Sequence, residues 1–178
     1  KKAVETSLKR LAPGYLRTVA LMTPPASTVQ NFNRLKQVLA ENLKVSENDL
    51  TEGKVPEDSD MLLVLAPTKV NDLQLKAIDQ FLMRGGSVVI ATSPFNVQIG
   101  QSITAKNHQS GLESWLENLG YEIGPAMVLD PQSTSLPVPV QRYIGGIPIR
   151  EIQLVPYPHF PDIRSDGISD KHPITSSL

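Results

Sequence analysis

The sequence predicts an α/β fold, in which a mostly parallel β-sheet is flanked by helices. Two apolar runs, Met61–Ala66 and Ser87–Ala91, have the length and composition of strands that are covered on both faces. The segment between them carries the start and stop signals of one helix. Because adjacent parallel strands need a crossover of this kind, the three segments predict a βαβ unit with a right-handed connection.

The first elements of the fold are predicted along residues 18–43. Thr18–Met22 is a short apolar strand, which Thr23-Pro24-Pro25 ends because two consecutive prolines cannot continue a hydrogen-bonded ladder. A helix should follow, with one face toward the core. Its apolar residues recur at the spacing of one helix face: Phe32, Leu35, Leu39 and Leu43.

Met61–Ala66 is predicted to be the central strand of the sheet. In the helix that follows it, Asn71 and Gln74 fit a capping box, and Gly85-Gly86 supply a stop with positive φ. The next strand, Ser87–Ala91, is expected to be buried. The helix between these signals carries an apolar stripe made of Leu75, Ile78 and Leu82.

Less regular structure is predicted after the second apolar strand. The polar stretch Asn96–Ser110 shows no clear period and should form a surface loop. A further amphipathic helix ends at a C′ glycine, and Trp115 within it is expected to anchor the core. Ala126–Leu129 offers another strand, which Asp130-Pro131 stops. The residues that mark the helix are Leu112, Trp115, Leu116, Leu119 and Gly120.

Proline sets the character of the last third of the chain. Nine of the 15 prolines lie from Pro125 onward, so this region should form extended segments and turns, with one strand inside Ile147–Val155. We expect a single α/β domain over residues 1–178. Its core would cover about residues 16–130, and a proline-rich extension would cover about residues 131–178.

Charge and composition exclude several classes of function. Lys and Arg number 17 against 18 Asp and Glu, and neither sign forms a long block, which argues against nucleic acid as a partner. The absence of cysteine excludes disulfides and thiolate chemistry. No apolar run approaches the roughly 20 residues that span a bilayer. Because the chain begins at Lys1 without a methionine, we read it as a segment of a longer protein, whose membrane anchor would lie outside it.

Candidate binding residues follow from the predicted sheet. In a parallel α/β sheet, ligands bind beyond the carboxyl ends of the strands. Here small hydroxyl residues stand beside prolines at those ends, on stiff loops that suit a polar ligand or a protein partner; simple strand termination is the alternative. The ends are Thr23–Ser27, Pro67–Lys69, Thr92–Pro94 and Asp130–Ser133. The candidate ligand- or partner-binding residues are Ser27, Thr68, Ser93 and Ser133.

No catalytic, metal or cofactor site is predicted. A nucleophile elbow needs Gly-x-Ser-x-Gly, and Thr92-Ser93-Pro94 lacks both glycines. Rossmann and P-loop phosphate motifs are absent. Nothing in the sequence places a histidine beside Ser93, where the candidates would be His108, His159 and His172. Three acids recur every four residues without the alternating ligands of a calcium loop, namely Asp162, Asp166 and Asp170.

Six short segments follow one another in an order typical of one family. They are Asp60–Pro67, Leu75–Ile90, Gly111–Leu116, Leu119-Gly120, Val128–Ser133 and His172–Thr175. They comprise an apolar strand, a helix ending in Arg-Gly-Gly with a second strand, a helix with tryptophan, a Val-Leu-Asp segment and a closing His-Pro-Ile motif. Over roughly residues 58–178 the chain resembles the extracytoplasmic region of gliding-motility-type auxiliary components of ABC transporters.

This resemblance implies a Rossmann-like or flavodoxin-like α/β domain of the glutamine-amidotransferase-like kind. It also implies a place on the extracytoplasmic (periplasmic) side of the cytoplasmic membrane, with transmembrane anchors outside this chain. The partners it implies are the permease and ATPase subunits of an ABC transporter. It brings no catalytic residues to carry over.

Three functions remain open from the sequence. The first, which we predict, is a non-catalytic extracytoplasmic binding module of an ABC-type transport system related to gliding motility, without a cofactor. The second is a serine-dependent hydrolase, against which stand the missing elbow and the missing cysteine. The third is a small-solute, sugar or nucleotide-binding domain, against which stand the missing phosphate loop and the few aromatic residues.

Overall fold

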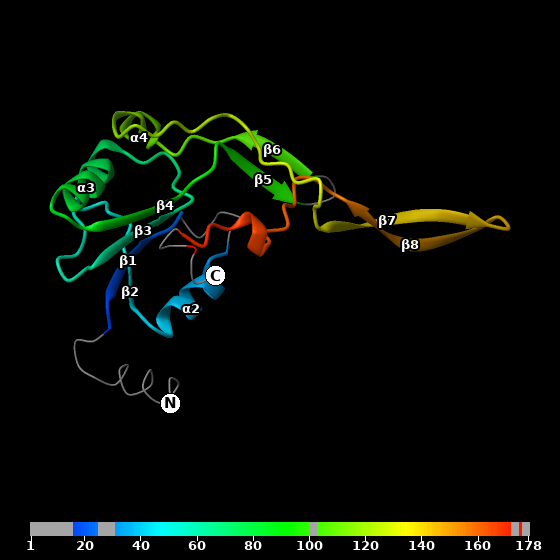
Figure 1. Cartoon of the computed structure of the whole chain (residues 1–178), viewed down its shortest axis with the longest axis horizontal. Coiled ribbons are helices and arrows are strands. Elements are labelled where there is room, and N and C mark those ends of the chain that lie inside the picture. Colours follow the sequence, from blue (N-terminus) through cyan, green and yellow to red (C-terminus); the bar gives the residue numbers. More distant parts are fainter. Residues whose placement is uncertain (1–15, 25–30, 100–102, 172–174, 176–178) are drawn as a thin grey trace. The chain divides into compact units, whose positions relative to one another are not determined.

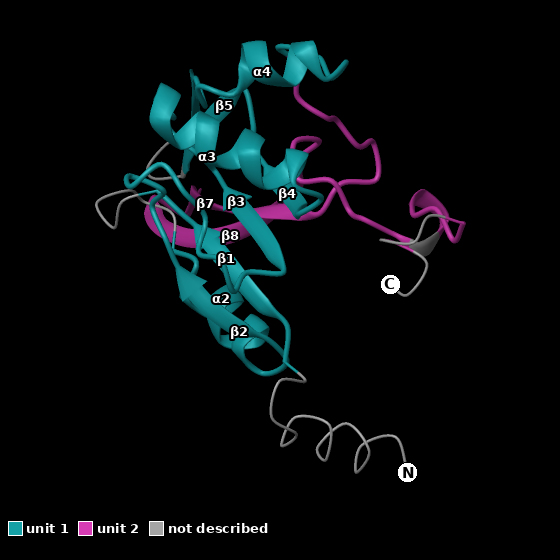
Figure 2. Ribbon diagram, turned by 90° about the vertical axis from the view of Figure 1, so that its left-hand side faces the viewer, with its two compact units in different colours: residues 1–125 teal, residues 126–178 magenta. Residues whose placement is uncertain are grey.

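The computed structural model describes residues 16–24, 31–99, 103–171 and 175, and Figure 1 shows its elements. The chain falls into two compact units, Lys1–Pro125 and Ala126–Leu178, which have different colours in Figure 2. The boundary between the units follows Pro125, whereas the proline-rich extension was expected to begin at about residue 131.

Four parallel strands form the sheet of the first unit, in the order β2-β1-β3-β4. Leu63 of the central strand lies between Leu21 and Val89 in the register, so these three side chains point to the same face. The predicted parallel sheet, its central strand and the βαβ unit are confirmed. The strands are β1 (Thr18–Met22), β2 (Lys44–Glu47), β3 (Met61–Leu65) and β4 (Ser87–Ala91).

The described helices of this unit are α2 (Asn33–Ala40), α3 (Asp72–Met83) and α4 (Glu113–Asn118). Figure 1 shows α2 and α3 on opposite sides of the sheet. This is what right-handed crossovers require when they leave the centre of a sheet in opposite directions.

Helix α3 begins and ends at the predicted residues. The Asn71 side chain accepts a hydrogen bond from the Gln74 backbone N–H, and the Gln74 side chain accepts one from the Asn71 backbone N–H, both at 3.0 Å. This reciprocal pair is a complete capping box, because it satisfies two of the donors that a helix start leaves free. The helix stops at Gly85, whose φ is +88°.

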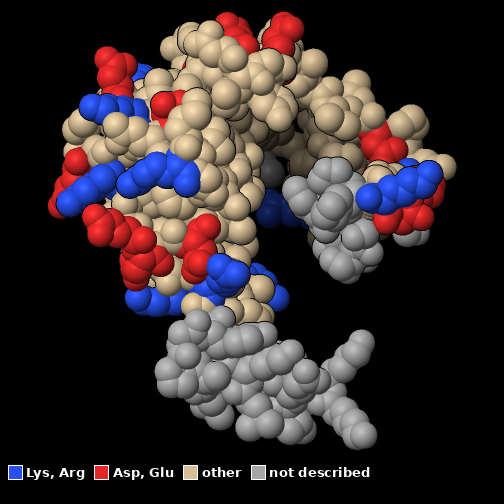
Figure 3. All heavy atoms as spheres, turned by 60° about the vertical axis from the view of Figure 1, so that its left-hand side comes forward, with Lys and Arg blue, Asp and Glu red and all other residues tan. Residues whose placement is uncertain are grey.

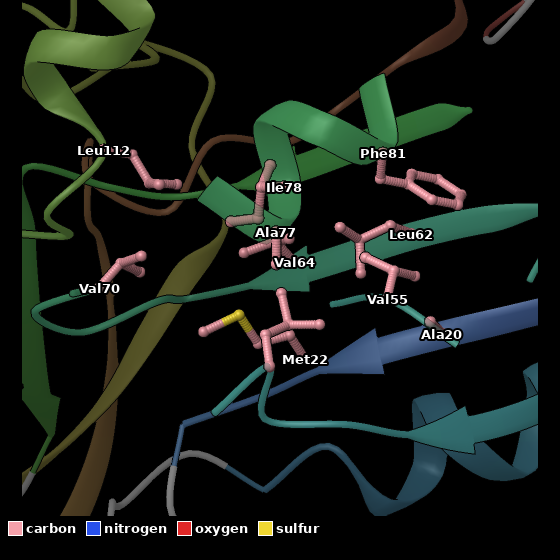
Figure 4. Close-up of a cluster of buried hydrophobic side chains, with 11 residues drawn as sticks. Ala20, Met22, Val55, Leu62, Val64, Val70, Ala77, Ile78, Phe81 and Leu112 are labelled. Carbon is pink, nitrogen blue, oxygen red and sulfur yellow. The ribbon is translucent and has the colours of Figure 1, made fainter. Parts of the chain in front are cut away.

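The core of the first unit lies between the sheet and α3. Leu62 and Val64 of β3 are fully buried and point toward Ala77 and Ile78 of α3 (Figure 4). The neighbouring strand contributes Ala20 to the same cluster. Since consecutive strand residues face opposite sides, the even-numbered positions of β1 and β3 form this core face.

Two loop residues and one helix residue complete this core. Leu50 and Val55, in the loop between β2 and β3, are 0% and 1% exposed, and nothing in the sequence pattern singled them out. Trp115 of α4 packs against the cluster, and its Nε1 donates a hydrogen bond of 3.0 Å to Oδ1 of Asp79 on α3. The prediction that Trp115 anchors the core is confirmed.

Two predictions about burial were wrong. The side chain of Val89 was expected to be buried, but it is 43% exposed. Strand β4 is an edge strand, and Val89 faces away from α3. The face of α2 was also expected to be buried, yet no residue of α2 is, and Leu35 is 38% exposed. Helix α2 is therefore a surface helix whose apolar face is only partly covered.

The segment predicted as a loop over Asn96–Ser110 is largely a hairpin. Strands β5 (Phe95–Ile99) and β6 (Ile103–Asn107) pair antiparallel. The alternation of Phe95, Val97 and Ile99 with polar residues is a strand signal. The polar residues at the other positions, which suit a two-stranded ribbon exposed to water, hid that signal.

The strand predicted at Ala126–Leu129 does not form, and Val128 is 75% exposed. The residues that follow are held by a different segment. The backbone N–H of Asp130 donates to the carbonyl oxygen of Pro158, and that of Thr134 donates to the carbonyl oxygen of Phe160, both at 2.9 Å. These two contacts lie within the second unit.

The second unit contains a long antiparallel hairpin of β7 (Ser135–Ile144) and β8 (Ile147–Pro156). The predicted extended structure and the strand inside Ile147–Val155 are confirmed, whereas β7 was not foreseen. Pro137 and Pro139 lie within β7. A two-stranded ribbon tolerates them because each strand has an outer edge where a missing N–H leaves no ladder bond unmade.

Arg164 draws three carboxylates together in this unit. Its guanidinium lies 3.7 Å from Asp130, 3.9 Å from Asp162 and 3.6 Å from Asp166. The backbone N–H of Gln132 lowers the pKa of Asp130 most. Burial opposes this effect, and the Asp162 N–H and Arg164 lower the pKa further, so that it lies below its ordinary value.

Candidate functional site

The carboxyl ends of β3 and β4 bring together two of the four predicted site residues. Thr68 follows β3, Ser93 follows β4, and both line a small cleft of about 40 Å³ together with Pro24 and His108. Ser27 lies outside the described residues. The strand end at which Ser133 was expected does not form, since Ser133 follows no strand of the parallel sheet and belongs to the second unit.

The backbone after β3 is unusual at this edge. Ala66 and Lys69 have φ values of +43° and +49°, a region that residues with a side chain rarely adopt. Two backbone hydrogen bonds hold the segment: Lys69 N–H to the Gln109 carbonyl at 3.2 Å, and Val70 N–H to the Ser110 carbonyl at 2.8 Å. Such conformations persist where surrounding contacts enforce them, and they are frequent at binding sites.

A larger cavity of about 420 Å³ opens beside this cleft. Its volume falls within the range of small-ligand pockets, about 300–1,000 Å³. It is formed by the loop after β3, the end of β4, the segment after β6 and the start of α4. Polar residues in the lining of the cavity include Lys69, Thr92, Ser93, His108, Glu113 and Ser114.

His108 is fixed by two hydrogen bonds at this site. Its backbone N–H donates to the carbonyl oxygen of Pro94 at 2.8 Å, and its Nε2 lies 2.8 Å from the carbonyl oxygen of Pro67. A carbonyl oxygen can only accept, so Nε2 carries the proton, and in the neutral ring Nδ1 is the acceptor. His108 thereby ties the end of β6 to the ends of both β3 and β4.

Glu113 is held by the loop in front of α4. Its carboxylate accepts hydrogen bonds from Ser110 N–H at 2.7 Å, Ser110 Oγ at 3.0 Å and Gly111 N–H at 2.9 Å. Burial taken alone raises the pKa of Glu113, but the hydrogen bonds from its own backbone N–H, from Ser110 and from Gly111 together outweigh burial and lower the pKa below its ordinary value. Glu113 is therefore an anion that stabilises the loop.

Thr92 places a buried hydroxyl at the wall of the cavity. Its Oγ1 is inaccessible to water and has no hydrogen-bond partner among the described residues. A buried hydroxyl without a partner is unfavourable by roughly 1–3 kcal/mol, and such groups call for an explanation in a native structure.

Ser93, His108 and Glu113 line one cavity but do not form a catalytic relay. Ser93 Oγ accepts from the Phe95 N–H at 3.2 Å, while His108 and Glu113 are engaged as described above. A serine nucleophile needs a hydrogen bond to its base, and the base needs one to its acid. Neither bond occurs in the described part of the chain.

His108 and Glu113 were not selected from the sequence. Ser110-x-x-Glu113 ahead of an apolar helix is a capping-box pattern, so this signal was available. His108 had no comparable signal, because only the fold brings it to Pro67 and Pro94. Across the described ranges no group of three or more His, Cys, Asp and Glu could hold a metal ion.

Charge is mixed over one face of the molecule. Figure 3 shows acidic and basic side chains interspersed over the face that it presents. Among the described helices, none is long and apolar enough to cross a membrane.

Comparison with protein families gives a match over most of the chain. A family model described as "ABC-type uncharacterized transport system" matches residues 16–178. No curated protein and no solved structure matches the chain.

Proposed function

Because the chain belongs to the ABC-type uncharacterized transport system family, we propose that it is the non-catalytic, extracytoplasmic binding module of such a system. It is an auxiliary component, and the proposal concerns its role: it presents a pocket to a polar ligand or to a polar segment of the permease. The resemblance to gliding-motility-type components extends the proposal to that branch of the family. The module would work on the periplasmic side, held by anchors outside residues 1–178.

The polar lining of the cavity is the observation that carries the binding role. The wall of this cavity of about 420 Å³ offers the Lys69 ammonium and the hydroxyls of Ser93 and Ser114. The Lys69 ammonium can only donate hydrogen bonds, the hydroxyls can donate as well as accept, and the one carboxylate nearby, Glu113, is occupied by its own loop. The pocket therefore suits a ligand rich in acceptors, such as a carboxylate, a carbonyl or a hydroxylated solute.

Lys69→Gln separates binding from stability. Lys69 is exposed at the cavity wall, so the variant should be about as stable as the native chain. It should nevertheless weaken binding to the pocket, because it removes the ammonium. Lys106→Gln on exposed β6 is the matched control and should change neither property.

A photo-crosslinking amino acid at Thr68 tests the partner. Thr68 is exposed beside the cleft, and Thr104 offers an equally exposed control position. In the full-length protein in its native membrane, the probe at position 68 should capture the permease, and the probe at position 104 should not. Capture only of proteins unrelated to a transporter, or equal capture from both positions, would overturn the partner assignment.

A serine hydrolase is the second candidate, because Ser93 and His108 line the same cavity. Hydrogen bonds at a catalytic site are often long before substrate binds, so the missing relay alone does not decide. A serine-reactive phosphonate and generic ester substrates decide it. The binding module should show neither labelling nor turnover, and Ser93→Ala should remain folded. Stoichiometric labelling at Ser93, or ester turnover lost in Ser93→Ala, would establish the hydrolase instead.

A further inference from the structure

The β7–β8 hairpin exposes apolar side chains along its whole length. Each strand has ten residues, and every residue of β8 is exposed. An isolated two-stranded ribbon is at best marginally stable in water, and exposed apolar clusters mark sites of interaction. The hairpin is therefore suited to contact something other than water.

The tip of the hairpin has a definite order of residue types. A Gly145-Gly146 turn with positive φ at both positions closes it. The first two cross-strand pairs behind the turn are Ile144 with Ile147 and Tyr143 with Pro148. The side chains of Ile144, Ile147 and Tyr143 are 55%, 66% and 67% exposed. The tip is thus wholly uncharged, mostly apolar and open to solvent.

Two arginines stand directly behind this tip, one on each face. Arg142 pairs with Ile149 in the third cross-strand pair, and Arg150 pairs with Gln141 in the fourth. Paired residues share a face and successive pairs alternate, so the two guanidinium groups point to opposite sides. Both arginines are exposed. Neither forms an ion pair with any described carboxylate, and the nearest acid along β8, Glu151, comes one pair later.

We propose that the tip of the β7–β8 hairpin, residues 143–148, inserts into the interface of a bilayer that contains anionic phospholipid, with Arg142 and Arg150 behind it at the level of the lipid phosphates. The distance from the Arg150 pair to the first pair is three strand steps of roughly 3.4 Å, about 10 Å. This matches the roughly 5–10 Å to which interfacial segments bury their apolar side. The isoleucines reach the acyl boundary, Tyr143 lies at headgroup level, and the arginines bind lipid phosphates.

The order of charges favours a lipid surface over a second copy of this chain. Two tips that met symmetrically would bring two like-charged pairs of arginines together, without an acid in the first four cross-strand pairs to compensate them. An anionic bilayer provides an apolar layer and, immediately outside it, a layer of negative charge. Along the hairpin, the apolar side chains of the tip and the arginines behind them follow one another in the same order as these two layers.

Vesicle sedimentation tests the proposal on the whole 178-residue chain. The chain should bind phosphatidylcholine vesicles that contain about one third phosphatidylglycerol, and should bind less as salt rises. Arg142→Gln with Arg150→Gln should weaken this binding by about tenfold or more. Ile144→Glu with Ile147→Glu should abolish it. Ile152→Glu is the control, because Ile152 is 71% exposed on the same strand but lies far behind the tip.

A fluorescent probe tests the depth of insertion. Tyr143→Trp places an indole at the tip, whereas the native Trp115 lies in the first unit and is common to both proteins. With brominated-chain phosphatidylglycerol vesicles, the added emission should shift to the blue and be quenched. The native chain should show no such change.

Several results would overturn the proposal. One is that the native chain unfolds cooperatively but does not bind anionic vesicles. Another is that the double variant Ile144→Glu with Ile147→Glu binds as well as the native chain. A third is that Ile152→Glu loses binding while the tip variants keep it. Concentration-dependent dimerisation that the tip variants abolish, with no vesicle binding, would show instead that the tip meets a second copy.

Discussion

The imidazole Nε2 of His108 and the carbonyl oxygen of Pro67 lie 2.8 Å apart, although 41 positions separate them in the chain. The bond joins the end of the β5–β6 hairpin to the carboxyl end of β3. It therefore fixes His108 at the cleft that Thr68 and Ser93 also line.

His108→Phe should destabilise the chain by about 0.5–1.5 kcal/mol, because it removes the net contribution of one hydrogen bond while keeping a ring of similar size. Urea unfolding followed by circular dichroism measures the change. The exposed neighbour Gln109 gives the control, and Gln109→Ala should lower the free energy of unfolding by less than His108→Phe does. Equal stability of His108→Phe and the native chain would show that the bond does not hold the loops.

Val64→Asp and Val89→Asp should differ strongly, although both residues lie on adjacent strands of the same sheet. Val64 is 0% exposed, so an aspartate there is a buried charge without a partner and should cost several kcal/mol, which is comparable to the stability of a whole domain. Val89 is 43% exposed on the edge strand and should tolerate aspartate at about 1 kcal/mol or less. Thermal unfolding compares the two. A cooperative, native-like melt of Val64→Asp would contradict the central position of β3.

Alanine replacements at three glycines should differ in how much they lower the free energy of unfolding, according to the backbone conformation and the space at each glycine. Gly85 has φ +88° and open surroundings, so Gly85→Ala should cost about 1 kcal/mol from conformation alone. At Gly111, φ is +85° and a Cβ atom would lie 2.6 Å from the backbone N and O of Val70, so Gly111→Ala should cost more. Gly124 has neither constraint and should be neutral. Chemical denaturation gives the order, and a Gly111→Ala variant as stable as Gly124→Ala would contradict it.

Acid should weaken the loop that Glu113 holds. The pKa of Glu113 is lowered in the folded chain from an ordinary value of 4.5, because burial, which raises it, is outweighed by the hydrogen bonds from the Glu113 backbone N–H, Ser110 and Gly111 together. A carboxyl whose pKa is lower in the folded chain than in the unfolded chain stabilises the fold at pH values above the unfolded pKa. This stabilisation is lost as the pH falls through the folded pKa. Glu113→Gln should therefore be less stable than the native chain at pH 7, and the difference should shrink from just above pH 4.5 downward.

Denaturation midpoints across a pH series measure this effect. Glu117→Gln, in the same helix, is the matched control, since no described residue donates a hydrogen bond to the Glu117 side chain. A constant difference between native chain and Glu113→Gln at all pH values would exclude an ionised Glu113 as the cause.

The elements that were predicted correctly have their cause in short stretches of sequence. Met61–Leu65 is apolar at every position because both of its faces meet other elements, and α3 carries its own capping box and glycine stop. The β5–β6 hairpin and β7 were missed for the opposite reason. Pro139 in β7 and the polar residues of β5 have low strand propensity. Segment β7 becomes a strand only through its pairing with β8, and β5 only through its pairing with β6.

The candidate site was predictable only in part. Thr68 and Ser93 could be placed together, because parallel strands end at the same edge of a sheet. His108 and Glu113 could not be assigned to that edge, since they reach it through a hairpin and a helix start whose positions no local pattern specifies. Ser133 shows the converse error: the Val-Leu-Asp segment before it is apolar enough for a strand, but its backbone groups bond to the 157–160 segment instead.

By itself the sequence determined the α/β class, the parallel strands β1, β3 and β4 and the limits of α3, because periodicity, capping and apolar runs act over a few residues. A resemblance of several short motifs indicated the transport family. Only the tertiary structure decided which side chains line the cavity, that Val89 is exposed at an edge, that Leu50 is buried from a loop, and that an apolar tip stands in front of two arginines. Those properties depend on contacts between distant segments, and a local pattern carries no information about which segments meet.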